Sequence, residues 1–287
     1  MASSSPHARP HTRSLAALDA ANFFLADVRD GLGPYLAIYL LSTLHWDAQH
    51  IGIAMSVMGM ATVFAQTPAG ILVDRTRRKR LFSVIASLLI AVASIAMILL
   101  PYSGVVFGSQ VVMGIAAAWF VPAIAAITLG LVGARSLDRR IGRNEMFNHA
   151  GNVCAAMLAG LIGYFFRIEG IFLLLAFMAL LSSIAIWRIC ENDIDHDEAR
   201  GMIRESDDSH SNSPSPFMAM MENRPLLFFA LACVLFHFAN AAMLPLLGQR
   251  LAQGISSGAS SAYMSACIIV AQLVMIQNFQ IDLELFV

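Results

Sequence analysis

The residues best suited to chemistry lie in an otherwise apolar stretch near the amino end of the chain. Asp27, Arg29 and Asp30 are charged, and on a helix the two acids share one face while Arg29 points elsewhere. A charge inside a membrane costs about 2.5–3.5 kcal/mol on insertion scales, so it must face a wet cavity or a partner. We expect one acid to gain and lose a proton while Arg29 pairs with it or with an anionic solute. The alternative is a structural ion pair that locks this helix to a neighbour.

The residues that follow these charges weaken a helix. Gly31, Gly33 and Pro34 come directly after Asp30. Glycine and proline are tolerated in spanning helices where the freed backbone groups find other partners or line a cavity. This pattern is typical of a helix beside a substrate path.

Four further polar residues recur at helical spacing in apolar stretches. Asn148 and Asn152 are four positions apart and share a face; they either line a cavity or bind a neighbouring helix. His237 and Asn240 lie one turn apart. Histidine titrates near neutral pH, so His237 is a candidate proton carrier, with a hydrogen bond to a neighbour as the alternative.

The sequence does not favour an enzyme. No Ser/His/Asp set, HExxH helix or phosphate-binding loop stands above chance, so we expect no catalytic residues, cofactor or metal. A net charge of −1 does not favour nucleic-acid binding. The cysteines are scattered without a CxxC pair and are expected to pack as small apolar residues: Cys154, Cys190, Cys233 and Cys267.

The composition predicts an all-α, multi-pass membrane protein. Apolar residues make up 58% of the chain and charged residues only 13%, against about half and a quarter in a soluble domain. A span needs about 20 mostly apolar residues, and short joins make neighbours antiparallel. Eight candidates are visible: 15–41, 50–73, 81–100, 104–131, 147–166, 169–189, 225–249 and 259–277.

The basic residues predict the orientation. With the N-terminus in the cytoplasm, most of the 18 Lys and Arg residues fall on the cytoplasmic side, as the positive-inside rule requires. We therefore expect a plasma-membrane protein with a cytoplasmic N-terminus. The residues on that side are Arg9, Arg13, Arg75, Arg77, Arg78, Lys79, Arg80, Arg135, Arg139, Arg140, Arg143, Arg188, Arg200, Arg204 and Arg224.

An acidic, Ser-rich segment divides the chain. We expect a cytoplasmic tail at 1–14, a six-helix bundle at 15–190, a linker at 191–224 and a partial second bundle at 225–287. The acids and His196 at 193–198 could be taken for a metal cluster, but the composition favours a solvated linker. Residues 217–222 are a candidate interfacial helix.

One loop resembles a known family. Gly70, Asp74, Arg75 and Arg78, within Gly70-Ile-Leu-Val-Asp-Arg-Thr-Arg-Arg-Lys-Arg80, resemble the loop signature of the major facilitator superfamily, with Arg77 where the family pattern has Gly. We expect Gly70 to allow close helix contact and Asp74 to cap a helix or pair with a base. Six spans, a linker and further spans match the half-linker-half plan of that family. A shift of 211 residues, which places Pro34 on Pro245, adds a weak internal repeat.

The resemblance implies a permease. It implies secondary transport of a small solute by alternating access, with lipid and solute as partners and protons as the candidate coupling ion. Many family members have a proton-coupling Arg where this sequence has Gln110. The resemblance also implies that the Asp74 loop acts as a conformational latch against late spans.

The carboxyl end departs from the family plan. Aligning Gln66 with Gln272 predicts a Gly near 276 and an Asp near 280, where the sequence has Ile276 and Gln280. We expect a truncated or frame-shifted product of about eight of the family's twelve spans. The alternative is a natural short form that self-associates, and a non-transporting remnant or regulatory partner is the second functional hypothesis.

Overall fold

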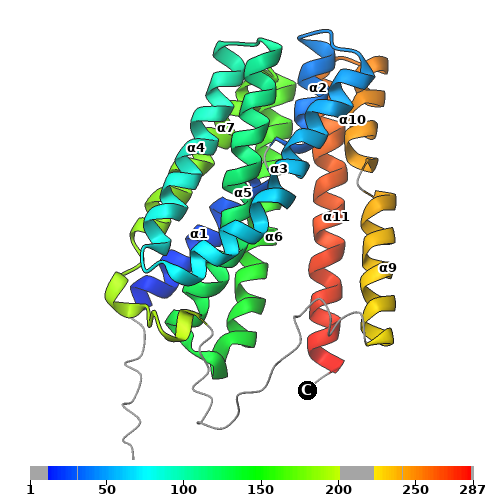
Figure 1. Ribbon diagram of the computed structural model, residues 1–287. Coiled ribbons are helices and arrows are strands. Elements are labelled where there is room, and N and C mark those ends of the chain that lie inside the picture. Colours follow the sequence, from blue (N-terminus) through cyan, green and yellow to red (C-terminus); the bar gives the residue numbers. More distant parts are fainter. Residues whose placement is uncertain (1–11, 31, 201–222, 241, 286–287) are drawn as a thin grey trace, which may run out of the picture.

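The chain forms a bundle of long helices in a computed structural model that describes residues 12–30, 32–200, 223–240 and 242–285 (Figure 1). Three short 3₁₀ turns, η1 (Ala134–Ser136), η2 (Glu191–Asp193) and η3 (Glu198–Arg200), join or follow the long helices. The α-helices are α1 (Thr12–Asp30), α2 (Gly33–Ser42), α3 (Ala48–Arg75), α4 (Lys79–Leu99), α5 (Ser103–Val132), α6 (Leu137–Phe165), α7 (Glu169–Trp187), α9 (Arg224–Asn240), α10 (Met243–Gly254) and α11 (Ser257–Leu285).

Two of the predicted spans are broken helices. The first consists of α1 and α2, and the seventh of α9 and α10. Asp30 and Asn240 end the first pieces, and Gly33 and Met243 begin the second ones, in each case 210 residues apart. The two breaks therefore support the internal repeat, one residue from the predicted shift. Gly33 has φ +45, a left-handed conformation that favours glycine at this break.

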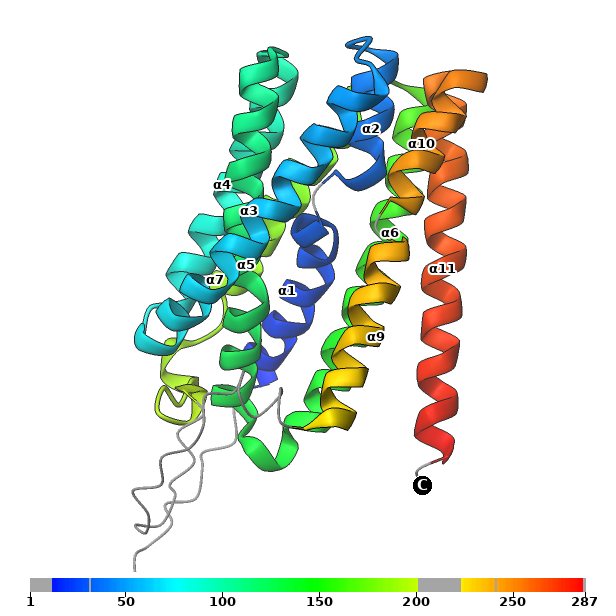
Figure 2. The same ribbon diagram turned by 45° about the vertical axis from the view of Figure 1, so that its right-hand side comes forward.

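Among the described residues, six segments are long and apolar enough to cross a membrane: α3, α4, α5, α7, α9 with α10, and Ser257–Met275 of α11. The other two predicted spans, α1 with α2 and α6, carry charged side chains and complete the bundle (Figure 2). α1 packs on α6 and α7. Leu18 and Val28 of α1 are fully buried. A helix with several charges thus lies inside the bundle, where other helices shield it from lipid.

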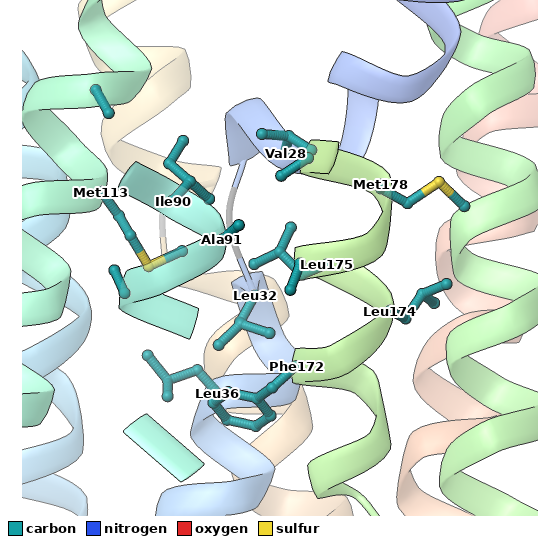
Figure 3. Close-up of a cluster of buried hydrophobic side chains, with 14 of the residues drawn as sticks. Val28, Leu32, Leu36, Ile90, Ala91, Met113, Phe172, Leu174, Leu175 and Met178 are labelled. Carbon is teal, nitrogen blue, oxygen red and sulfur yellow. The ribbon is translucent and has the colours of Figure 1, made fainter. Parts of the chain in front are cut away.

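The apolar core joins α1 and α2 to the helices around them. Figure 3 shows Val28, Leu32 and Leu36 packed beside Ile90 of α4 and Phe172 of α7. All five are at most 4% exposed. Elsewhere α3, α4 and α9 present large apolar side chains on the surface, as expected of helices that face lipid.

The basic residues gather at one end of the bundle, which we call the basic end. The described ends there are the start of α1, the joins α3–α4 and α5–α6, the end of α7 and the start of α9 (Figure 1). At the opposite end Asp47 caps α3 by accepting a hydrogen bond from the backbone N–H of His50 (2.9 Å). That hydrogen bond lowers the pKa of the exposed Asp47 carboxyl below its usual value.

Part of the predicted linker is packed. Ile194 and Ala199 are buried against the ends of α1 and α5, and Leu18 belongs to the same cluster. The backbone N–H of Asp195 donates to the carbonyl of Gly130 (2.8 Å). Residues 191–200 are therefore a structured cover rather than a solvated segment, because Ile194 and Ala199 pack into an apolar cluster with side chains of α1 and α5. The candidate interfacial helix at 217–222 lies outside the described residues.

The covering segment holds no metal site in the described part of the chain. No group of three or more His, Cys, Asp or Glu side chains there could hold a metal ion. Asp193 instead accepts a hydrogen bond from Ser14 (2.5 Å), and Glu198 accepts one from the backbone N–H of Ala134 (3.0 Å). Its acids thus fasten the segment to the bundle.

Candidate functional site

A cavity of about 300 Å³ lies where the two broken helices meet α6 and α11. Its lining includes one carboxyl and three amide side chains, Asp27 of α1, Asn152 of α6, Asn240 of α9 and Gln272 of α11, besides Tyr35 of α2. Each comes from a different helix, so only the folded bundle brings them together. One carboxyl and three amides can donate to and accept from a small polar solute.

The helix breaks position two of these groups. Asp27 lies in the last turn of α1, and Asn240 is the last residue of α9. The Asn240 side chain donates to the carbonyl of Phe236 (2.8 Å), one turn earlier in α9, which holds the amide at the end of the helix. Pro34 and Pro245, which follow the breaks, also line the cavity. The repeat thus places a polar side chain and a proline from each half at one site.

Two hydrogen bonds hold the α11 wall of the cavity. Nδ1 of His149 on α6 is 2.6 Å from Oε1 of Gln272, and its role as donor depends on the tautomer. The hydroxyl of Tyr35 lies 2.7 Å from that of Ser265, and both residues are buried. These pairs link α6 and α2 of the first half to α11 of the second.

Glycine allows α6 and α11 to approach closely. A Cβ on Gly160 would lie 2.7 Å from the Ser265 hydroxyl, and one on Gly163 would lie 2.6 Å from Cβ of Ser261. Small residues with hydroxyl partners are a common way to pack spanning helices. These close contacts between α6 and α11 fix the position of α11, which forms one wall of the cavity.

The halves also touch at the end away from the basic end. α2 packs against α10 there (Figure 2). A Cβ on Gly248 would lie 3.1 Å from the carbonyl of Pro34 and 3.5 Å from Ile38. The cavity is therefore covered on that side by close backbone contact.

Of the eight predicted cavity residues, the lining contains Asp27, Asn152 and Asn240. Asn148 is buried one turn away on α6 and donates to Glu145 (3.2 Å). Its amide therefore hydrogen-bonds within α6, whereas the sequence suggested that it lines a cavity or binds a neighbouring helix.

The remaining predicted residues lie elsewhere. Gln110 is buried on α5, where its amide is 3.4 Å from the carbonyl of Ala54 on α3. Arg29 is half-buried on α1, and His237 is exposed on α9. The side chain of Asp30 lies outside the part that the structure describes.

The signature loop joins α3 to α4 at the basic end. A Cβ on Gly70 would meet nothing within 4 Å, so the close contact predicted there is wrong for the described chain. Asp74 is exposed, and α4 begins after Arg78 without a side-chain cap, so the predicted capping role is also wrong. Lys79 is buried and donates to the carbonyl of Thr76 (2.8 Å), which closes the turn. Arg75 and Arg78 are exposed.

Sequence reasoning missed several residues of the site. The sequence marked Gln272 only as the repeat partner of Gln66, and it gave no functional signal for Tyr35, His149 or Ser265. Tyr35 follows the Gly-Pro break and His149 lies between the two asparagines, so both stood beside predicted residues. Ser265 had no signal, because its partner is 230 positions away.

A larger groove does not have this character. It measures about 740 Å³ between α2, α4 and α7, at the end opposite the basic end. Its walls are mainly apolar, and its charged residues, Arg167 and Glu169, pair with each other (3.1 Å). The smaller cavity, with polar groups from both halves, is the better candidate site.

The comparisons with known proteins agree with this arrangement. Residues 18–278 match the model of the Major Facilitator Superfamily. Two relatives in Mycobacterium tuberculosis (strains CDC 1551 / Oshkosh and ATCC 25618 / H37Rv), both described as uncharacterized MFS-type transporters, are 50% identical over 264 residues. The match covers 92% of this chain, and the chain spans 63% of the length of each relative.

A solved structure shows the same fold. The crystal structure of a mutant of the nucleoside transporter NupG has a TM-score of 0.68 at 17% identity. The match covers 94% of this chain and 66% of that one.

The helical bundle, its repeated broken helices and the family match together define the class of membrane protein to which the chain belongs. The chain belongs to the major facilitator superfamily and is a multi-pass membrane protein.

Proposed function

We propose that this chain forms the solute pathway of a secondary transporter that moves a small polar solute by alternating access, without converting it chemically. The observation that carries the proposal is the cavity in which Asp27, Asn152, Asn240 and Gln272 meet between the halves. Polar groups inside a spanning bundle are costly and commonly mark substrate or ion paths. Transporter sites of this kind lie at the interface between repeats, beside broken helices.

The lining favours a small solute with both hydrogen-bond donors and acceptors. The volume of about 300 Å³ is at the lower end of ligand pockets. An ionised Asp27 would accept hydrogen bonds from hydroxyl or amino groups of the solute, while the three amides serve either role.

Proton coupling is assigned to the acids of the first span. Asp27 lines the cavity, whereas Gln110 cannot titrate and is buried against α3. We propose that Asp27 gains and loses the coupled proton, with Asp30 and Arg29 of the same helix as auxiliary groups. Asn148, His237 and the Gly70, Asp74, Arg75 and Arg78 loop stay candidates for supporting roles in the conformational change.

The contacts favour a conformation that faces the basic end. α2 and α10 pack closely at the opposite end, whereas α9, which begins at the basic end, has no comparable packing against a described helix of the first half. By the positive-inside rule we propose that the basic end, and so the N-terminus, lies in the cytoplasm, with the plasma membrane as the membrane concerned. The proposed state is thus closed to the outside.

The experiment is uptake by proteoliposomes that contain the pH dye pyranine. Panels of sugars, amino acids, nucleosides and organic acids are added outside under an imposed proton gradient. We expect at least one panel to cause proton movement that Asp27→Asn abolishes. Asp138→Asn, which neutralises an exposed acid in the first turn of α6, is the matched control and should behave as the unaltered chain.

Two results would contradict parts of the proposal. Proton-coupled flux that survives Asp27→Asn removes that residue from coupling. No flux in any panel, combined with no effect of any solute on thermal unfolding, would favour the second hypothesis, a non-transporting membrane partner. Crosslinking of the reconstituted chain would then test whether it self-associates.

A further inference from the structure

A second hollow lies between α1 and α7 at the basic end and has no part in the proposed solute path. This groove measures about 490 Å³. Arg13 of α1 and Arg188, directly after α7, line its charged end. Ala16 and Ala20 leave room along α1, and Leu181 contributes apolar surface from α7.

The guanidinium groups of the two arginines have no hydrogen-bond partner among the described residues. Both are exposed, and neither forms an ion pair with a residue in the described part of the chain. Asp193, which lies at this end, is bound by the Ser14 hydroxyl (2.5 Å). Guanidinium groups match phosphate oxygens well, and two from different helices can hold one phosphate between them.

The charged end of the groove lies at the depth of lipid headgroups. Trp187, immediately before Arg188, is 58% exposed. The guanidinium of Arg80 lies 5.4 Å from its ring centroid. Exposed tryptophans with basic neighbours mark the boundary between membrane and water.

The groove also has the length of a lipid chain. Arg13 and Phe24 both line it and are eleven residues apart on α1, which corresponds to about 16 Å along a helix. Half of a hydrocarbon core of about 30 Å is nearly the same distance. The groove thus runs from headgroup level toward the middle of the bilayer.

We infer that this groove binds an anionic phospholipid of the leaflet at the basic end. Its phosphate lies between Arg13 and Arg188, and one acyl chain follows Ala16 and Ala20 toward Phe24. Such a lipid would tie α1 to α7 from outside. The inference needs a membrane-spanning bundle, which the family match supports, but does not depend on any solute.

The test is native mass spectrometry of the full chain in detergent after delipidation. Dioleoyl phosphatidylglycerol and dioleoyl phosphatidylethanolamine are added back separately. We expect the anionic lipid to bind more tightly. Each basic residue near an anionic headgroup contributes about 1 kcal/mol, so Arg13→Gln with Arg188→Gln should weaken that binding roughly 10- to 30-fold.

Two further variants make the result specific. Arg135→Gln with Arg139→Gln removes two exposed charges at the same end, away from the groove, and should leave the affinity unchanged. Ala16→Phe keeps both charges but fills the groove, and should weaken binding of the anionic lipid. Thermal unfolding of each variant checks that it is folded.

Three outcomes would overturn the inference. The first is equal retention of the two lipids by the unaltered chain. The second is an equal loss of affinity in the Arg135/Arg139 variant. The third is retention that Ala16→Phe leaves intact, which would point to phosphate attraction without an acyl-chain site.

Discussion

The helices α1 and α6 are fastened at the basic end by a buried ion network. Oδ1 of Asp19 is 2.7 Å from Nη2 of Arg140, and Oδ2 is 2.8 Å from Nη2 of Arg143. The side chains of Asp19 and Arg140 are 10% and 7% exposed, whereas that of Arg143 is 55% exposed. One carboxylate therefore pairs with a buried and a half-exposed cation, and the network keeps a net charge of +1.

Asp19→Asn should strongly destabilise the bundle. Removing one partner of a buried pair costs about 3–5 kcal/mol, because the Arg140 charge stays buried without compensation. At roughly 2 °C per kcal/mol for a chain of this size, the unfolding temperature should fall by about 6–10 °C. Arg143→Gln removes a half-exposed partner, so it should cost less than about 1 kcal/mol and shift the temperature by no more than about 2 °C.

The measurement is tryptophan fluorescence during heating of the purified protein in detergent, at one scan rate for all variants. The double variant Asp19→Asn with Arg140→Gln should lose less than the sum of the single losses, since it removes the uncompensated charge. The reasoning is refuted if Asp19→Asn is no more damaging than Arg143→Gln, or if the double variant is strictly additive.

Three smaller predictions use the same heating assay. Gly151→Leu should lower the unfolding temperature strongly, because a Cβ there would overlap the carbonyl of Phe23 on α1. Gly108→Leu is the control and should leave the temperature nearly unchanged, because nothing lies within 4 Å of a Cβ at that position. Equal effects of the two variants would contradict the assigned packing of α1 on α6. Ile194→Ala should lower the free energy of unfolding by about 2–5 kcal/mol, because Ile194 is only 5% exposed. It should also speed proteolytic cleavage of the covering segment that follows Arg188; an unchanged cleavage rate would mean that Ile194 does not hold this segment to the bundle. Tyr35→Phe should lower the unfolding temperature by about 2 °C, since it removes one buried hydrogen bond of about 1 kcal/mol; an unaltered temperature would show that the bond contributes no net stability.

The packing of α1 connects these stability predictions with the proposed transport. Asp19 binds the start of α1 to α6, and Gly151 of α6 allows the two helices to lie close together. Asp27, near the other end of α1, reaches the cavity. A shift of α1 against α6 would therefore move the acid that we assign to proton coupling.

Much of the fold was predictable from local sequence. The apolar runs, the short joins and the basic clusters indicate antiparallel spans, because the cost of burying charge in lipid acts on each segment separately. The Gly31 to Pro34 stretch predicted the weak point where α1 ends, and the loop from Gly70 to Arg80 indicated the family. The ranges of most helices agree with the predicted spans, since periodicity and composition are properties of one segment.

The site depended on which segments meet. Asp27, Asn152 and Asn240 carried a local signal, as polar side chains in apolar runs, but so did Gln110 and His237, which the bundle places elsewhere. Gln272 and Ser265 joined the site through partners 123 and 230 positions away. The sequence by itself determined that costly polar groups lie within the membrane. Only the tertiary structure decided which of them share a cavity, because that depends on helix rotation and on close glycine contacts between segments far apart in the chain.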